Sequence, residues 1–293
     1  MLAENTNPQK NQILYASENN NFAAEILNKE ILKHTSKNKL NRFQILNTVI
    51  GKMSGIIQSP QVIQQLSLTP LVPGMSKAIL IEEFNKIYIS KITLPDVSKG
   101  ILVFKEKENL LPFEEAKLFG HNAIHSLLGY LASLKGYVFM SEIKKDKYLL
   151  KLARDAFLNE SGASLIKKYR HTGELLFTKK GYQDYADDLL ERMVNPYLHD
   201  EVERVCRDPI RKLGYNDRIF GTMREALKQG IVPEIMAKGV YAALCYLKKK
   251  FKAESPELDS LLNIRSFLSK IWKHEELDEY SDQCIDLVLK VKL

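Results

Sequence analysis

The hydrophobic pattern of the chain changes near residue 110. Before that point, short runs of β-branched and aromatic residues alternate with polar breaks, whereas afterwards apolar residues recur at helical spacing almost to the end. A sheet can therefore form only in the first part of the chain. This order predicts an α+β protein, with a partial α/β domain at residues 1–110 and an all-α domain at residues 111–293.

The first part reads as strands around one helix. Residues 12–17 and 42–50 have the composition of strands, and residues 22–37 between them carry apolar side chains at helical spacing. Strand, helix and strand in this order predict part of a parallel sheet. Two further strands are predicted at residues 77–84 and 86–92.

The second part reads as consecutive helices, separated by breaks in which Gly, Pro, Asn and Asp gather. The predicted helices cover residues 111–134, 146–171, 178–193, 200–213, 217–228, 232–249, 256–270 and 274–290. The sequence contains no internal repeat and no low-complexity tract.

Composition and cysteine use argue against several classes of protein. No apolar run approaches the roughly 18 residues of a membrane span, and the first residues lack the features of a secretory signal. We therefore expect a cytoplasmic protein without a membrane partner. Cys206, Cys245 and Cys284 are widely spaced and read as reduced thiols. The six histidines form no H-E-x-x-H motif, so no metal site is expected.

The formal net charge of +7 raises the question of nucleic-acid binding. However, the basic residues are dispersed among acidic neighbours, and the densest run, residues 247–252, lies at a predicted helix end where solvated lysines are common. We therefore expect no nucleic-acid partner. A positive field equally suits a small anionic substrate such as a sugar phosphate.

The predicted helix at residues 111–134 carries polar groups in an otherwise apolar sequence. Asn122 and His125 are three residues apart and therefore neighbours on a helix, and Lys117 can reach toward them. An amine, an amide and an imidazole suit the interconversion of a carbonyl and an alcohol, because they can exchange a proton, stabilise an alkoxide and bind a hydroxyl. The alternative is that each is an ordinary structural or solvated residue.

The spacing K-x-x-x-x-N-x-x-H in "KLFGHNAIHSLLGYL" resembles the signature helix of the polyol-specific long-chain dehydrogenases, the mannitol dehydrogenase family. Further segments resemble this family in the same order, and the last of them is most similar to members specific for mannitol 1-phosphate. These segments are "LYASENNNF" (14–22), "ILNTVIGKM" (45–53), "PLVPGMSKAILIEEFNKIYI" (70–89), "NESGASLIKKY" (159–169) and "NPYLHDEVERVCRDPIRKLGYNDRI" (195–219).

The resemblance implies a fold and an activity. The first domain would be a partial Rossmann-like domain, and the second would resemble the C-terminal domain of 6-phosphogluconate dehydrogenase. The protein would transfer hydride between a nicotinamide cofactor, NAD, and a ketose phosphate or polyol phosphate. Its catalytic residues would be the acid/base Lys117, the oxyanion partner Asn122 and the hydroxyl ligand His125.

The same resemblance implies binding residues outside the signature helix. Arg204 and Lys212 would point into the substrate cleft, with Arg207 as a phosphate partner, since guanidinium groups bind phosphate oxygens in pairs. A solvated basic helix face is the alternative for this block. The other implied ligands are Asn47 and Glu83 for the substrate and Glu18 and Asn19 for the cofactor.

The sequence also departs from the family pattern. None of its 14 glycines are spaced G-x-G, so the turn that holds a pyrophosphate is missing. Gly51 and Lys52 stand where the family has an Asp-Arg pair, and residues 91–111 read as an insertion. Three interpretations follow: a truncated product that is inactive alone, one piece of a split enzyme completed by a partner chain, or a diverged protein that only binds a sugar phosphate.

Overall fold

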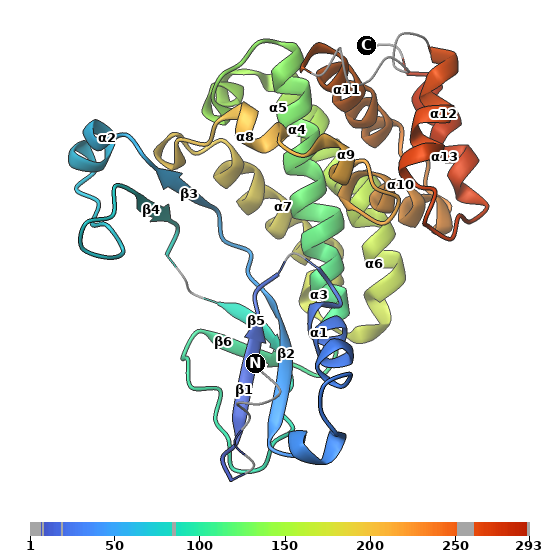
Figure 1. Cartoon of the computed structure of the whole chain (residues 1–293). Helices are drawn as coiled ribbons and strands as arrows, with labels where there is room; N and C mark the ends of the chain where they lie inside the picture. Colours follow the sequence, from blue (N-terminus) through green and yellow to red (C-terminus); the bar gives the residue numbers. More distant parts are fainter. Residues whose placement is uncertain (1–6, 8, 19, 84–85, 251–260, 292–293) are drawn as a thin grey trace. The chain divides into compact units, whose positions relative to one another are not determined.

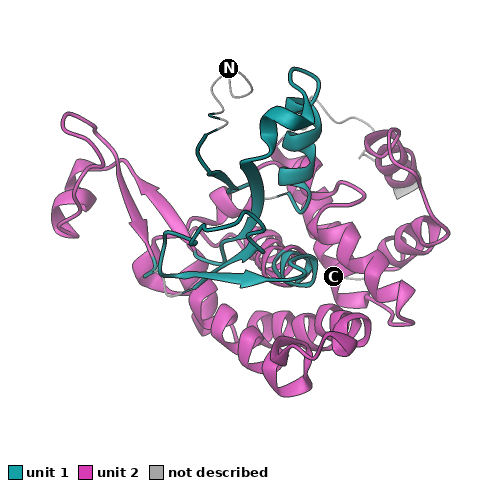
Figure 2. Ribbon diagram, turned by 90° about the horizontal axis from the view of Figure 1, so that it is seen from below, with its two compact units in different colours: residues 1–52, 82–117 teal, residues 53–81, 118–293 magenta. Residues whose placement is uncertain are grey.

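The computed structural model describes residues 7, 9–18, 20–83, 86–250 and 261–291. Two compact units, distinguished by colour in Figure 2, comprise residues 1–52 with 82–117 (unit 1) and residues 53–81 with 118–293 (unit 2). The division into two domains at residue 110 stays a prediction. Each unit draws on two separate stretches of the chain.

Unit 1 is built around a small mixed sheet. Its elements are β1 (Gln12–Ala16), α1 (Ala23–Ile31), the 3-10 helix η1 (Lys37–Leu40), β2 (Phe43–Val49), β5 (Ile87–Ser90), β6 (Phe104–Lys107) and α3 (Leu111–Glu115). The strand order is β1-β2-β5-β6. As predicted from the order strand, helix, strand, β1 and β2 run parallel, from Gln12 opposite Phe43 to Ala16 opposite Asn47.

The other two strands of this sheet complete its core. β5 runs antiparallel to β2, and β6 runs parallel to β5. Leu46, Ile89 and Phe104 are buried together, and the ring of Tyr15 lies 4.7 Å from that of Phe104. β6 lies within residues 91–111, so the segment that reads as an insertion in the sequence contributes a strand to the sheet.

The helix predicted at residues 22–37 is shorter than expected. α1 buries Ala24 and Ile31 and ends there, and Leu32 is already 39% exposed. The next seven residues, "KHTSKNK", carry no apolar side chain before Leu40. A further helical turn would have nothing to bury, so the chain turns instead.

Unit 2 contains a hairpin formed by β3 (Ser54–Ile57) and β4 (Ala78–Ile81), with α2 (Pro60–Gln65) between the strands. The strand predicted at residues 77–84 thus becomes β4, but it pairs with β3 and does not belong to the sheet of unit 1. Ile56 and Ile79 face each other across the two strands and are both exposed. The hairpin extends away from the helices of the same unit (Figures 1 and 2).

The remainder of unit 2 is helical, as predicted (Figure 1). Its α-helices are α4 (Ala123–Leu134), α5 (Lys147–Asp155), α6 (Ala163–Tyr169), α7 (Lys179–Met193), α8 (Val202–Cys206), α9 (Pro209–Lys212), α10 (Arg218–Lys228), α11 (Glu234–Lys250), α12 (Leu261–Ile271) and α13 (Tyr280–Leu289). Its 3-10 helices are η3 (Met140–Lys145), η5 (Arg170–Thr172), η6 (Leu175–Phe177) and η7 (Pro196–Leu198). The π-helical segment η4 (Ala156–Gly162) joins α5 to α6, and a second, η2 (Ala116–Asn122), joins α3 to α4.

Some predicted helices differ in detail. The helix expected at residues 200–213 is broken into α8 and α9, because Asp208 adopts a left-handed backbone (φ 56°) immediately before Pro209. The helix expected at 274–290 begins only at Tyr280. Residues 256–260 of another predicted helix lie outside the described part of the chain.

The single tryptophan anchors the last helices. Trp272 is buried, and its indole N–H donates a hydrogen bond to the carbonyl of Leu213 (2.8 Å). Its ring packs against Tyr215 and Phe220, at 5.2 and 4.5 Å between centroids. The segment from α12 onward is therefore tied to the start of α10. No helix in the described parts of the chain is both long and apolar enough to cross a membrane.

α4 is the central helix of unit 2, and two glycines allow neighbouring helices to approach it closely. A Cβ on Gly129 would lie 2.5 Å from a methyl carbon of Val205 in α8. A Cβ on Gly239 of α11 would lie 2.7 Å from a methyl carbon of Leu127. Since real Cβ atoms do not tolerate such distances, these helices could not remain where they are if either glycine gained a side chain.

We expect Gly129→Ala to lower the free energy of unfolding by about 1–3 kcal/mol, because the overpacking cost exceeds the gain in helix propensity. Urea denaturation measures this change. The double variant Gly129→Ala with Val205→Ala removes the opposing methyl groups, so its destabilisation should be smaller than the sum of the two single effects. A single variant as stable as the wild type would contradict this packing argument.

Candidate functional site

The predicted catalytic residues lie on one continuous run of helix. Lys117 and Asn122 lie in the π-helical segment η2, and His125 lies in the first turn of α4. The unit boundary falls within this run, so that Lys117 belongs to unit 1 and the other two residues to unit 2. Because η2 has i→i+5 hydrogen bonds, the side-chain directions expected from regular α-helical spacing do not apply to it.

Two glycines and one tyrosine explain where the π-helical segments pack. Gly120 in η2 and Gly162 in η4 both face Tyr182 of α7: a Cβ on either would lie 2.8 or 2.7 Å from that side chain. The hydroxyl of Tyr182 lies 3.1 Å from the hydroxyl of Ser161. Tyr182 therefore fills the space that the two glycines leave open.

His125 lies against a buried acidic residue. Its Nε2 lies 3.1 Å from Oδ2 of Asp200, and the side chain of Asp200 is only 5% exposed. Among the described residues neither atom has a hydrogen-bond partner, so their contact is a short ion-pair distance and not a well-aligned hydrogen bond. The other carboxylate oxygen, Oδ1, accepts a hydrogen bond from Nε of Arg204 (2.7 Å). Imidazole, carboxylate and guanidinium thus form a continuous chain of contacts.

The charge of Asp200 is stabilised by these contacts. Burial alone would raise the pKa of the Asp200 carboxyl, but the contacts with His125 and Arg204 outweigh burial and lower that pKa below its ordinary value. The carboxylate is therefore ionised at neutral pH. Sequence reasoning missed Asp200, although "HDE" begins three residues after Pro196, in the break that follows the preceding helix.

The backbone around Asp200 is fixed by bonds to a second segment. The carbonyl of Asp200 accepts from the N–H of Met140 (2.9 Å), and the N–H of Val202 donates to the carbonyl of Val138 (2.8 Å). Phe139 and Glu201 form an isolated antiparallel bridge between these two contacts. The carboxylate is thus held on a rigid support, as a residue that orients a functional imidazole requires.

A cavity of about 410 Å³ adjoins Asp200 and Arg204. It is lined on one side by the hairpin segment 53–59 and on the other by Leu198, His199 and Phe139. All of these residues belong to unit 2. The cavity combines backbone, an ionised carboxylate and a guanidinium, which is a polar lining suited to a ligand with several hydroxyl groups.

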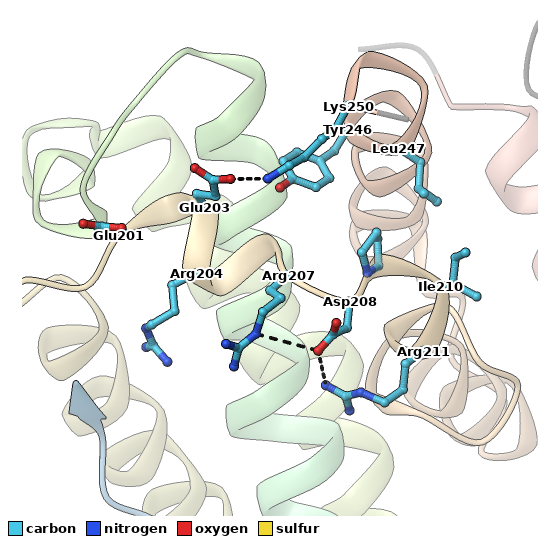
Figure 3. Close-up of a pocket in the computed structure, with 11 residues that line it drawn as sticks. Glu201, Glu203, Arg204, Arg207, Asp208, Ile210, Arg211, Tyr246, Leu247 and Lys250 are labelled. Carbon is cyan, nitrogen blue, oxygen red and sulfur yellow. Dashed lines mark hydrogen bonds and ion pairs between the residues drawn. The ribbon is translucent and has the colours of Figure 1, made fainter. Parts of the chain in front are cut away.

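A second cavity, of about 780 Å³, shares Glu201 and Arg204 with the first. Figure 3 shows its residues, which come from α8, α9, α11 and the residues that flank α8. Its cationic side chains are Arg204, Arg207, Arg211 and Lys250, and its carboxylates belong to Glu201, Glu203 and Asp208. Two of the predicted basic ligands, Arg204 and Arg207, therefore line one cavity.

Lys212 lies elsewhere. It is buried, and its ammonium donates a hydrogen bond to the carbonyl of Val205, while lying 5.9 Å from the centre of the Tyr130 ring. Burial and the nearby charge of Arg218 lower the pKa of Lys212 to about 8. It is not among the residues lining either cavity, and its role in substrate binding stays a prediction.

Asn47 occupies the end of β2 in unit 1. Its side-chain oxygen accepts from the N–H of Ala24 (2.8 Å), while its NH₂ group donates to Glu25 Oε2 (2.8 Å) and to the carbonyl of Asn21 (3.4 Å). Both N–H groups of the amide are thus used, and the residue caps the first turn of α1. A role in substrate binding would rest on its remaining acceptor capacity.

A buried carboxyl group near Lys117 was not identified from the sequence. Glu114 in α3 is 6% exposed. Burial, together with the charges of Glu25 and Glu115, raises the pKa of Glu114 to about 8, although nearby Lys117 acts in the opposite direction. Glu25 also accepts a hydrogen bond from Asn47, so it interacts with both Asn47 and Glu114. The available signal was the i, i+3 spacing of Glu114 and Lys117.

Three predicted ligands remain. Glu18 is exposed just beyond β1, and Glu83 is exposed beyond β4. Asn19 lies outside the described residues. The predicted roles of all three stay predictions. Among the described residues, no group of three His, Cys, Asp or Glu side chains is arranged to hold a metal ion.

Comparison with known proteins identifies a family. The model of the mannitol dehydrogenase C-terminal domain matches residues 109–283. A mannitol-1-phosphate 5-dehydrogenase of Shouchella clausii is 29% identical over 274 residues, which are 91% of this chain and 66% of that protein. The enzyme of the same name from Exiguobacterium is 36% identical over 182 residues, 62% of this chain and 45% of that protein. The chain thus spans about half to two thirds of these relatives.

Solved structures agree on the fold. The mannitol 2-dehydrogenase of Pseudomonas fluorescens, in a ternary complex with NAD and D-mannitol, has a TM-score of 0.70 at 18% identity, covering 95% of this chain and 58% of the other. A D-sorbitol dehydrogenase has the same TM-score at 17% identity, covering 94% and 59%. The predicted fold, a partial Rossmann-like domain followed by a helical domain, is confirmed.

The raised pKa of Glu114 predicts a pH-dependent contribution to stability. The folded state holds this proton up to about pH 8, whereas the unfolded state releases it near 4.5. The contribution of the protonated carboxyl to the free energy of unfolding is therefore complete below pH 4.5. It is lost as pH rises to about 8, and the free energy of unfolding falls by at most about 1.4 kcal/mol per pH unit. Glu114→Gln should gain stability relative to the wild type over this range in urea denaturation.

Glu108→Gln provides the control, because its side chain is 78% exposed. The stability difference between this variant and the wild type should stay nearly constant between pH 5 and 8. A constant difference for Glu114→Gln as well would show that its carboxyl ionises normally.

Proposed function

The chain belongs to the mannitol dehydrogenase family, and from this premise we propose that it forms the substrate-binding and proton-transfer part of an NAD-dependent polyol-phosphate dehydrogenase. The substrate would be mannitol 1-phosphate or a related polyol phosphate, and the product the corresponding ketose phosphate. The names of the matching relatives support this substrate class. The observation that carries the proposal is the contact chain His125–Asp200–Arg204, of which Asp200 and Arg204 line a polar cavity.

Lys117 is the proposed acid/base. In the oxidation of an alcohol, its neutral amine would take the hydroxyl proton while hydride leaves the same carbon, which becomes a carbonyl; in the reverse direction, the ammonium would return the proton. Asn122 would donate its amide N–H to the oxygen on which negative charge develops. Glu114 is electrostatically coupled to Lys117, so the charge state of one influences the proton affinity of the other.

His125 would bind a second hydroxyl group. Nε2 of His125 lies 3.1 Å from the buried carboxylate of Asp200, so Nδ1 would be the nitrogen that faces the substrate. Arg204, whose guanidinium is held by the same carboxylate, would present its remaining N–H groups to the ligand. A substrate rich in hydroxyl groups uses such a set of fixed donors and acceptors for orientation.

The hydride acceptor needs residues that this sequence does not contain. NAD would supply the hydride chemistry, but none of the 14 glycines are spaced G-x-G, and Glu18 is exposed beyond β1. The residues of this chain alone therefore do not fit the pyrophosphate of a dinucleotide. We assign no step through the cofactor to them.

An enzyme assay tests the proposal. Purified protein is mixed with NADH and fructose 6-phosphate, alone and with candidate partner chains, and the loss of NADH absorbance is followed. Lys117→Ala should reduce turnover by at least about 100-fold, in the range of general acid-base catalysis, while sugar-phosphate affinity changes little. The exposed Lys145→Ala serves as the control and should keep full activity. Normal turnover by Lys117→Ala would refute its assigned role.

The missing G-x-G pattern favours a second candidate function, a non-catalytic sugar-phosphate-binding protein or a subunit of a split enzyme. Thermal unfolding distinguishes the two, because a ligand stabilises the state to which it binds. A rise in Tm with mannitol 1-phosphate, no rise with NADH and no turnover with any partner would support the binding function. A rise in Tm with NADH alone would argue against it.

A further inference from the structure

The larger cavity of unit 2 contains two loosely held guanidinium groups. Nε of Arg207 lies 3.7 Å from Oδ2 of Asp208, and Nη2 of Arg211 lies 4.0 Å from the same oxygen (Figure 3). Both distances exceed the roughly 2.7–2.9 Å of a charge-assisted hydrogen bond. One carboxylate therefore stands between two cations without binding either of them closely.

The two arginines differ from the other cations of this cavity. Arg204 is bound to Asp200 at 2.6 Å, and Lys250 is paired with Glu203. Arg207 has, among the described residues, only its contact with Asp208, and its side chain is 72% exposed. Arg211 has one further partner, Asp217, at 3.3 Å. Positive charge is thus least neutralised around Asp208.

The position of Asp208 depends on an unusual backbone. Its φ of 56° is in the left-handed region, which Asp and Asn enter more readily than most residues, although at a cost. This conformation ends α8, starts α9 at Pro209 and places Arg207 and Arg211 on either side of the Asp208 carboxylate (Figure 3). Such backbone strain is often found at functional sites.

We propose that Arg207 and Arg211 form a phosphate clamp and that Asp208 holds the clamp open when no phosphate is bound. The phosphate monoester of the substrate would take the place of the carboxylate, since its three terminal oxygens can accept from both guanidinium groups at once. This inference rests on the proposed function, because it names the group by which a polyol phosphate is distinguished from a free polyol.

The connection between the two cavities supports this assignment. Arg204 lines both cavities and shares Asp200 with His125. A ligand with hydroxyl groups in the first cavity, beside Asp200, and a terminal phosphate at the clamp would therefore pass Arg204. Ile210 and Pro209 line the second cavity beside the clamp.

Calorimetric titration of the full chain tests the clamp with three ligands: mannitol 1-phosphate, mannitol and inorganic phosphate. Arg211→Gln should lower the affinity for both phosphate ligands at least about tenfold, which is the loss expected for one charge-assisted interaction. Its affinity for mannitol should stay unchanged. Arg265→Gln is the matched control, since Arg265 is similarly exposed (44% against 53%) and also paired with two carboxylates. It should bind all three ligands like the wild type.

Asp208→Asn provides a test in the opposite direction. Asn keeps the shape of the side chain and adopts the left-handed backbone readily, but it lacks the competing charge. We expect this variant to bind mannitol 1-phosphate and inorganic phosphate several-fold more tightly than the wild type does. The difference between variant and wild type should depend less on salt concentration for mannitol, which is uncharged, than for the two phosphate ligands.

The clamp is refuted if wild-type protein binds mannitol 1-phosphate no better than mannitol, if Arg211→Gln binds phosphate like the wild type, or if Asp208→Asn binds it more weakly. These results are independent of turnover. Loss of phosphate affinity in Arg211→Gln, in a protein that shows no dehydrogenase activity with any partner, would support the clamp and reject the catalytic proposal. Dehydrogenase turnover, together with an Arg211→Gln variant whose phosphate affinity is unchanged, would support the catalytic proposal and reject the clamp.

Discussion

The packing of Tyr182 against two glycines determines the geometry of the helix that carries the signature residues. Gly120 and Gly162 lie in the two π-helical segments, and each leaves room for the same tyrosine. A larger residue at either position would displace a turn of the helix and, with it, Asn122 and His125. The π-helical form of these segments and the packing of Tyr182 against the two glycines thus depend on each other. The arrangement of the functional groups follows from both.

The second constraint is electrostatic. Asp200 is a buried carboxylate that contacts one imidazole and one guanidinium. Its burial would be costly without these partners and without the bonds that fix its backbone to the segment at Val138–Met140. A group held in this way has little freedom to reorganise when a ligand binds, which is the property that a substrate-orienting residue needs. The exposed arginines of the neighbouring cavity are held much less firmly and can adapt to an anion.

The sequence predicted the positions of the helices and strands better than it predicted which strands pair with each other. Periodicity located β1, β2 and nearly all the helices, because it reports the face that each element buries. It could not show that β4 pairs with β3, since pairing depends on contacts between distant residues. It also could not show the break at Asp208, because Asp before Pro is compatible with several turns and only the surrounding packing selects the left-handed one.

The candidate site was predicted in part. The spacing of Lys117, Asn122 and His125 drew attention to the helix whose His125 contacts Asp200, but Asp200 and Glu114 became visible only through burial and proximity. A short apolar sequence does not reveal which of its acidic residues will be enclosed. Conversely, Lys212 and Asn47 were placed with the substrate by resemblance, whereas the structure gives each of them hydrogen bonds within its own unit. These bonds are sufficient to explain why an amine and an amide lie in the interior.

The anchoring of Trp272 has a practical consequence. It is the single indole of the chain, enclosed between Tyr215 and Phe220 in unit 2, while unit 1 contains none. Its fluorescence emission therefore reports the undocking of the last helices without a contribution from the sheet. The chain thus carries an intrinsic optical probe that separates events in one unit from those in the other, with no label attached.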